Sequence, residues 1–336
     1  TDFSRGQAWY DLIAQVDPND PYTVVVGAIN LFRSTDSANT WTQLSHWYGG
    51  FGHPYVHADQ HEFIFKPGSS TEVLSGSDGG VAISTNFTSN RPAWSERNDA
   101  YTTTQFYAGA INPLAGSDMM FAGAQDNGTQ RVNAPGNSNA DRVTGGDGAF
   151  CFVDEVSPNI VITSSQFQRY NISFNNGNSF SNLVNLGGPF IGPADYDSDL
   201  GILYASKGRD AVHRVRNITS GVVTEELSLR GIAANFRTTP THLRVSPFID
   251  SASTLYVGGE NARLVRVDSA DVQGSEIITN ISGTNFPSGA YVSCVEVGRS
   301  EDELVVTFSN YGVNSVYYTN DGGQTWANKE GDLPDM

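Results

Sequence analysis

The sequence predicts an all-β fold of seven repeated units, a seven-bladed β-propeller. Its 336 residues include 35 glycines and 14 prolines, which together with many Asn, Ser, Thr and Asp residues are typical of short strands joined by tight turns. The apolar runs stay near strand length, and none has the 3.6-residue period of a long amphipathic helix. Two landmarks recur along the chain with a unit of about 41–52 residues, and 336 divided by seven is 48. Such a period, with about four strands in each unit, is typical of a propeller.

The first landmark is the pattern S-x-D-x-G-x-T-W. It occurs as STDSANTW from Ser34 and as TNDGGQTW from Thr319, with a weaker copy, SFNNGNSF, from Ser173 and a broken copy from Ser84 to Trp94. We expect the Asp to accept backbone N–H groups across a hairpin turn, the Gly to take a positive φ and the Trp to pack between sheets. A structural role is therefore expected for Ser34, Asp36, Trp41, Ser173, Asn175, Asp321, Gly323 and Trp326.

The second landmark is a short apolar strand that usually ends in a small residue. The endings are VVVG (24–27), VLSG (73–76), MFAG (120–123), VITS (161–164), LYAS (203–206), LYVG (255–258) and VVTF (305–308). In the first unit this indicates strands at 10–17, 23–27, 31–34 and 41–44. We expect one domain, 1–336, with approximate blades at 7–46, 55–98, 101–143, 145–186, 189–232, 239–283 and 289–334.

The charge and cysteine content narrow the class of protein. Acidic residues number 36 against 19 basic ones, a net charge of −17, and no basic stripe is present, so nucleic acid is not an expected partner. No run of 18 apolar residues is present, so no membrane span is expected. Cys151 and Cys294 lie in apolar strand patterns three blades apart, and we expect both thiols to be unbonded.

At the S-x-D-x-G-x-T-W repeats the chain resembles the Asp-box (BNR-repeat) propellers, which include sialidases, xyloglucan-cleaving glycosidases, sortilin-type receptors and photosystem-assembly factors. A closer resemblance, from residue 7 to about 150, rests on VHADQH (56–61), SDGGV (77–81), GAQDNGT (123–129) and GGDG (145–148). This part is similar to secreted bacterial proteins labelled glycosyl-hydrolase-like, which are often fused to sorting or adhesion modules. The resemblance implies an extracellular or cell-surface protein within a larger multidomain chain or assembly.

The resemblance implies a fold but no activity. The only Arg-Pro pair is Arg91-Pro92, and the sequence has no evident counterpart to the sialidase arginine triad or to the xyloglucanase acid and base. An Asp-box marks a fold, and function has to be argued from a site.

The four quoted motifs carry the candidate metal and catalytic residues. Blade topology is expected to bring them to one rim, where a strand at 57–61 would place alternate side chains on one face. Imidazoles would suit zinc and carboxylates calcium, which gives His57, Asp59, His61, Asp126 and Asp147 as candidate metal ligands. Two carboxylates of the set Asp59, Asp78, Asp126 and Asp147 could instead catalyse glycoside cleavage. A third interpretation is that these side chains only cap turns and link neighbouring blades.

The same rim is expected to be aromatic. The Gly-rich segment 46–55 looks like a long loop, and aromatic faces beside polar groups suit sugar rings. The candidate ligand-binding residues are Trp47, Tyr48, Phe51, Tyr55, Arg169, Tyr170 and Arg209, although each aromatic ring could also serve as a wedge between blades.

Three functions remain open from the sequence. The favoured one is a non-catalytic binding or adhesion module for glycan or protein, because no recognisable catalytic set is present. The alternatives are a glycoside hydrolase or lyase that uses the rim carboxylates, and a structural segment of a larger surface assembly. The only cofactor that the residues indicate is a divalent cation, calcium or zinc.

Overall fold

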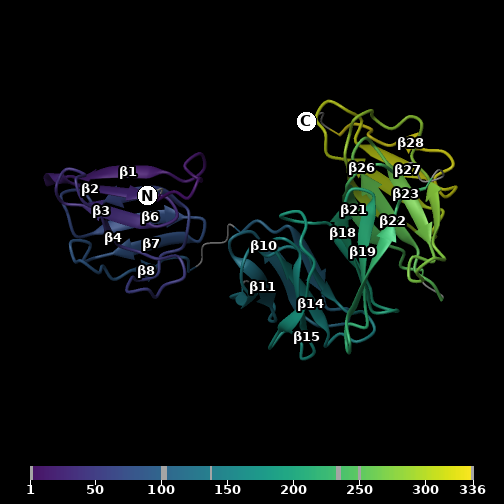
Figure 1. The fold of residues 1–336 in the computed structure, drawn as a ribbon, viewed down its shortest axis with the longest axis horizontal. Coiled ribbons are helices and arrows are strands. Elements are labelled where there is room, and N and C mark those ends of the chain that lie inside the picture. The colour runs from purple at the N-terminus through teal and green to yellow at the C-terminus, as the bar shows by residue number, and fades with distance from the viewer. Residues whose placement is uncertain (1–2, 100–103, 137, 232–235, 249–250, 334–336) are drawn as a thin grey trace. The chain divides into compact units, whose positions relative to one another are not determined.

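The protein is all-β, with the seven four-stranded antiparallel sheets of a seven-bladed β-propeller (Figure 1). The computed structural model describes residues 3–99, 104–136, 138–231, 236–248 and 251–333. Each sheet pairs its four strands in the order of the chain, without crossovers. No helix within these ranges is long and apolar enough to cross a membrane. The chain forms two compact units, Thr1–Thr104 and Gln105–Met336.

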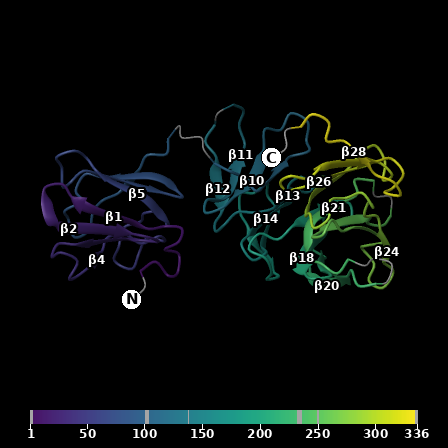
Figure 2. The same ribbon diagram turned by 90° about the horizontal axis from the view of Figure 1, so that it is seen from above.

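The first unit contains the first two sheets, drawn in purple and blue in Figure 2. Their first strands contact each other, and one hydrophobic core joins the sheets around Val25, Phe63 and Phe87. The strands are β1 (Ile13–Asp17), β2 (Asp20–Gly27), β3 (Leu31–Ser34), β4 (Thr42–Gln43), β5 (Gln60–Phe65), β6 (Val73–Ser77), β7 (Gly80–Ser84) and β8 (Ser95–Glu96).

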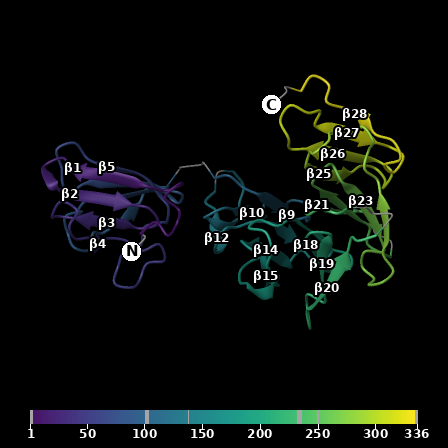
Figure 3. The same cartoon turned by 45° about the horizontal axis from the view of Figure 1, so that its top comes forward.

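The second unit contains the other five sheets (Figure 3). Neighbouring sheets contact through their first strands, β9 with β13, β17 with β21 and β21 with β25. The strands of the third and fourth sheets are β9 (Ala108–Ile111), β10 (Met120–Ala124), β11 (Gly128–Val132), β12 (Asp141–Thr144), β13 (Cys151–Val153), β14 (Val161–Ser165), β15 (Arg169–Ser173) and β16 (Ser181–Asn185). Those of the last three are β17 (Ala194–Asp197), β18 (Ile202–Gly208), β19 (Ala211–Arg216), β20 (Val223–Ser228), β21 (Pro240–Val245), β22 (Leu255–Gly259), β23 (Leu264–Asp268), β24 (Ile277–Asn280), β25 (Val292–Val297), β26 (Leu304–Phe308), β27 (Val316–Thr319) and β28 (Ala327–Asn328).

The middle strands of the sheets are more deeply buried than the outer strands. All five residues of β22, LYVGG, are buried, whereas the outer strand β24, IITN, is mostly exposed. A strand with packed sheets on both faces is expected to be apolar at successive positions rather than at alternate ones. Burying a Val or Leu side chain contributes roughly 1.5–3 kcal/mol, so a strand such as β22 makes a large contribution to the hydrophobic stabilisation.

Small residues near the end of the second strand are required by the next sheet. A Cβ atom on Gly123 would lie 1.9 Å from the carbonyl oxygen of Ala149, just before β13. One on Gly258 would lie 2.4 Å from a side-chain carbon of Val292, in the first strand of the following sheet. Both distances are far shorter than a van der Waals contact, so the recurrent small residue reflects close packing between blades.

The S-x-D-x-G-x-T-W turns form the hairpins β3–β4, β15–β16 and β27–β28. In each, the hydroxyl of the first residue accepts the N–H of the fifth: Ala38 to Ser34 at 2.9 Å, Gly177 to Ser173 at 2.9 Å and Gly323 to Thr319 at 3.2 Å. The third residue accepts the N–H of the seventh: Thr40 to Asp36 at 2.8 Å, Ser179 to Asn175 at 3.0 Å and Thr325 to Asp321 at 2.9 Å. Hydrogen bonds from Thr40 and Ser34 lower the pKa of Asp36 to about 2, and those from Thr319 and Thr325 do the same for Asp321.

The two tryptophans of these turns differ in their packing. Trp326 is 8% exposed, and its Nε1–H donates to the carbonyl oxygen of Ile281 in the preceding sheet at 2.8 Å. Trp41 is 42% exposed, and its sheet is the first of its unit.

The two thiols are unbonded, as expected. Cys151 lies in β13, where its Sγ–H points at the carbonyl oxygen of Phe121 at 3.4 Å, and burial raises the pKa of the thiol to about 12. Burial also raises the pKa of Cys294, which lies in β25. Neither thiol is therefore a reactive nucleophile at neutral pH.

Candidate functional site

The segment of His57, Asp59 and His61 does not form one strand face. Strand β5 begins at Gln60, Asp59 has a left-handed backbone with φ of 63°, and the pairing with β6 shifts between Gln60 and Glu62. Alternation of side chains requires extended backbone throughout. The expectation of three side chains on one face is therefore wrong, and only His61 projects from the strand.

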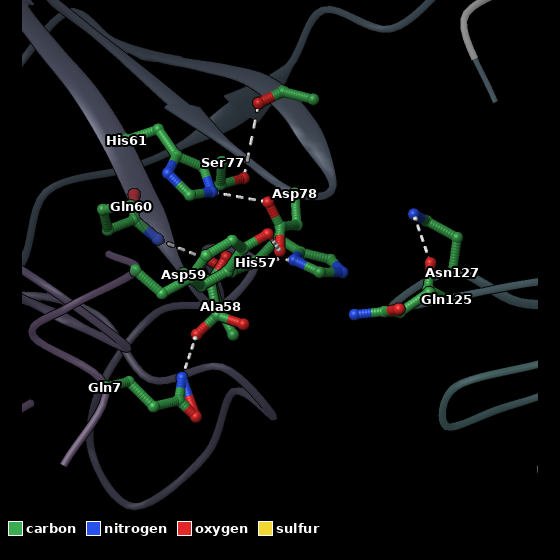
Figure 4. A network of polar contacts seen from close by, with 12 residues as sticks. Gln7, His57, Ala58, Asp59, Gln60, His61, Ser77, Asp78, Gln125 and Asn127 are labelled. Carbon is green, nitrogen blue, oxygen red and sulfur yellow. Dashed lines mark hydrogen bonds and ion pairs between the residues drawn. The ribbon is translucent and has the colours of Figure 1, made fainter. Parts of the chain in front are cut away.

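The side chains around Asp59 and Asp78 nevertheless form a polar cluster within the first unit (Figure 4). His61 Nε2 lies 2.6 Å from Asp78 Oδ1, and the Tyr10 hydroxyl donates to Asp78 Oδ2 at 2.8 Å. The Tyr10 ring stands edge-on to the His61 ring, with centroids 4.9 Å apart. Gln7 Nε2 donates to Asp59 Oδ1 at 3.1 Å, and the nearest carboxylate oxygens of Asp59 and Asp78 lie within 4.8 Å of each other.

Asp11 is the member of this cluster that sequence reasoning missed. It precedes β1 and has none of its surface exposed, and among the described residues no hydrogen-bond donor reaches either carboxylate oxygen. Burial, and then the neighbouring Asp59 carboxylate, raise the pKa of Asp11 to about 6. In the sequence it stands between Tyr10 and Leu12 near a strand, and nothing there signals that Asp59, 48 positions later, is its neighbour.

Asp126 and Asp147, the other two predicted carboxylates, come together in the second unit. Asp147 Oδ1 accepts the backbone N–H of Asp126 at 3.0 Å, and the N–H of Asp147 donates to Gln166 Oε1 at 2.9 Å. The pKa of the nearby Tyr107 is raised by burial and by these two carboxylates. These bonds tie the turn between β10 and β11 to the segment before β13, as the turn-capping interpretation expects.

The predicted aromatic loop is a well-defined structure in the first unit. His46 N–H donates to the carbonyl oxygen of Pro54 at 2.9 Å, and a second pair of backbone atoms joins His53 to Gly50 at 2.8 Å. The rings of Trp47 and Tyr48 have centroids 3.9 Å apart, and those of His46 and Phe51 are 4.7 Å apart. Tyr48 is 73% and Phe51 82% exposed, and Tyr55 is partly exposed. The loop therefore exposes the aromatic rings of Tyr48 and Phe51 at the surface.

The three predicted ligand contacts of the second unit behave differently. Arg169 and Arg209 are exposed, at the start of β15 and in the turn between β18 and β19. Tyr170 is only 1% exposed and packs in a hydrophobic core with Ile162 and Leu203. Its assignment as a ligand contact is wrong, because side chains alternate along β15 and the position after the exposed Arg169 faces the core.

Comparison with known proteins supports the propeller fold and no particular function. No protein-family model matches the chain, and no curated protein sequence matches it. The structure is similar to that of YCF48 from Cyanidioschyzon merolae, with a TM-score of 0.52 and 12% identity over 97% of this chain and 87% of that one. A GH74 xyloglucanase from Xanthomonas campestris has a TM-score of 0.45 and 15% identity, and the match covers 94% of this chain and 53% of the enzyme. At 12% identity, the similarity to YCF48 shows the propeller fold alone. The TM-score of 0.45 for the xyloglucanase is too low to support an argument.

Proposed function

We propose that the protein is a non-catalytic binding module that recognises glycan through the loop at 46–55. The observation that carries this proposal is the exposure of Tyr48 and Phe51 on a loop that is already ordered by its own hydrogen bonds. Aromatic faces stack on the C–H faces of sugar rings, and a pre-ordered loop loses little conformational entropy when it binds. A tie from Trp47 N–H to Asn30 Oδ1 at 3.0 Å anchors the loop to its sheet.

A glycan array with the full chain, followed by titration calorimetry on the best ligand, tests this proposal. We expect the double variant Tyr48→Ala/Phe51→Ala to bind at least about tenfold more weakly, the loss typical of an aromatic anchor. Tyr22→Ala is the matched control, because Tyr22 is also a largely exposed aromatic residue of the same unit, on β2. Equal affinity of the double variant and the wild type, or no glycan ligand at all, would contradict the proposal; a protein ligand lost in the double variant would replace glycan with protein.

A glycoside hydrolase is the second candidate function, and the closeness of two carboxylates favours it. The nearest oxygens of Asp59 and Asp78 lie within 4.8 Å of each other, so the two carboxylates are neighbours, as the catalytic pair of a retaining enzyme is at about 5–5.5 Å. Against it, both oxygens of Asp78 already accept hydrogen bonds, from Tyr10 and His61. A hydrolase would cleave the glycan that it binds and would lose cleavage, with binding retained, in Asp78→Asn. If the wild type releases no sugar, the hydrolase function is rejected and the binding module remains as the proposed function.

We further propose that the three hairpin turns are Asp-boxes and that the chain belongs with the secreted bacterial proteins of that kind. Support comes from the shared hydrogen bonds of the turns at Ser34, Ser173 and Thr319. The same resemblance of motifs supports an extracellular or cell-surface location, within a larger chain or assembly. Immunodetection of the protein in source cells and in their medium tests this location, and a purely cytoplasmic signal would reject it.

A further inference from the structure

Basic side chains gather at one end of the fifth sheet, although the protein as a whole is acidic. They lie on three segments, the end of β18 with its turn to β19, the segment after β20 and the segment before β21: Lys207, Arg209, Arg230 and Arg237. We call these four residues the basic patch. Two acids, Asp210 and Glu226, stand beside them, so this surface is positive in a chain whose net charge is −17.

Backbone hydrogen bonds bring the three segments together. Asp210 N–H donates to the carbonyl oxygen of Thr238 at 2.9 Å, and Leu229 N–H donates to the carbonyl oxygen of Asp210 at 2.8 Å. The turn at Asp210 is therefore fixed to the residues next to Arg230 and Arg237. Because the bases come from separate segments, the sequence shows no basic stripe.

The side chains of Arg209 and Arg230 converge on one carboxylate. The Nε atom of each lies 3.9 Å from Asp210 Oδ2, so the two nitrogens are no more than about 7.8 Å apart. A separation of 3.9 Å is too long for a hydrogen bond. Neither guanidinium donates a hydrogen bond to a described residue, and the two side chains are 72% and 76% exposed. Their N–H donors are therefore available to a ligand.

Two neighbouring guanidiniums with unused donors match an oxyanion. A planar guanidinium binds the two oxygens of a carboxylate through parallel N–H donors, and tetrahedral oxyanions are held in the same way. Asp210 offsets only one of the two positive charges, and its side chain is only 13% exposed. The remaining charge and the unused donors favour a ligand that carries carboxylate or sulfate groups.

We propose that the basic patch binds the carboxylate or sulfate groups of an acidic glycan. The choice of a glycan rests on the proposed function, whereas the anionic groups follow from the patch itself. Because the chain outside the patch is strongly acidic, an acidic polysaccharide is attracted selectively to this surface. Arg209, which the sequence predicted as a ligand contact, belongs to this patch.

Isothermal titration calorimetry of the full chain with two matched pairs of polymers tests the patch. Dextran sulfate is compared with dextran, and polygalacturonate with its methyl ester, so the two pairs separate recognition of sulfate from that of carboxylate. We expect the wild type to bind one charged polymer or both about tenfold or more tightly than the neutral counterpart, and the difference to shrink as the salt concentration rises. Arg209→Ala/Arg230→Ala should lose most of this difference. Arg209→Lys/Arg230→Lys should recover only part of it, because lysine keeps the charge but not the planar fork.

Arg142→Ala/Arg299→Ala is the matched control. Both residues are exposed in the same unit, on β12 and after β25, and each double alanine variant lowers the net charge from −17 to −19. The control should keep the wild-type preference for the charged polymer. Equal losses in the two alanine variants, or a wild type without any preference for charge, would overturn the proposal. Poly-L-glutamate that binds as tightly as either polysaccharide would overturn the assignment to a glycan.

Tyr48→Ala/Phe51→Ala separates this proposal from the proposed function, because it leaves both arginines in place. If this variant keeps the wild-type affinity for a charged polymer while the arginine variant loses it, the loop at 46–55 is rejected and the basic patch stands. If it loses glycan binding while the wild type does not distinguish charged from neutral polymers, the basic patch is rejected and the loop stands.

Discussion

The tryptophan of the last hairpin turn should be worth several times as much stability as the one in the first. Trp326 is almost fully buried among Phe286, Phe308 and Tyr317, and its indole N–H satisfies the carbonyl oxygen of Ile281. Replacing a core Trp with Ala typically costs 3–5 kcal/mol, and an unsatisfied buried carbonyl accounts for roughly 1–3 kcal/mol of such a loss. We therefore expect Trp326→Ala to lower the free energy of unfolding by about 4 kcal/mol.

Trp41→Ala provides the internal comparison, because Trp41 occupies the same place in its turn but is 42% exposed. Its replacement should cost no more than about 1 kcal/mol, the usual size for a side chain that keeps much of its contact with water. Urea unfolding followed by far-UV circular dichroism measures both, and Trp326→Phe separates the lost hydrogen bond from the lost packing. Equal losses for the two Ala variants would refute the argument that burial of the ring, rather than the turn itself, determines the contribution of the tryptophan.

Two further changes test buried charges of the second unit. Burial raises the pKa of Asp195 to about 6 against the opposing charge of Arg244, so the folded state binds a proton more tightly than the unfolded chain. The resulting stability is fully present below about pH 4 and is lost as the pH rises through 6. Relative to Asp195→Asn, the wild type should lose about 2.5 kcal/mol between pH 4 and 7, and parallel stability profiles would disprove this. Arg214 is fully buried and pairs with Glu225 at 2.8 Å and Glu276 at 3.1 Å. Arg214→Ala should cost about 3–5 kcal/mol in urea unfolding, because it removes the buried partner that Glu225 and Glu276 share and leaves Glu225 only Arg216, at 3.7 Å. A loss below about 1 kcal/mol would show that the two carboxylates recover partners elsewhere.

The fold could be predicted because the residues that determine it are close together in the sequence and their pattern recurs along the chain. The hydrogen bonds of the turn at Ser34 involve residues two to four positions apart, so its pattern is visible in any short window of sequence. The recurrent small residue marks the approach of the next blade, as the distance from Gly123 to Ala149 demonstrates. The boundaries of the strands were predicted less exactly. The first strand was expected to begin at residue 10 and begins at Ile13, and the second was expected to begin at residue 23 and begins at Asp20.

The candidate site was predicted only in part, because its side chains come from segments that are far apart in the sequence. His61 and Asp78 belong to one sheet, and their contact follows from blade topology. The alternation of His57, Asp59 and His61 failed because one residue, Asp59, takes a left-handed backbone that its own type does not signal. Asp11 was missed because its neighbour lies in a different sheet, and a buried Asp near a strand has the same one-letter signature as an exposed one.

The order of the strands has a consequence for how the chain folds. Every strand pair in the described residues joins neighbours in sequence, so each β-ladder forms by closing a short loop, such as the one between Ser34 and Thr42. Rates of folding rise as contacting residues lie closer along the chain, because less loop entropy is lost before the contact forms. The hydrogen bonds within each sheet can therefore be completed as soon as its own four strands have left the ribosome. During synthesis, no inner strand of such a chain has to remain unpaired until a strand distant in sequence is made. The time during which unpaired strands could aggregate is therefore short.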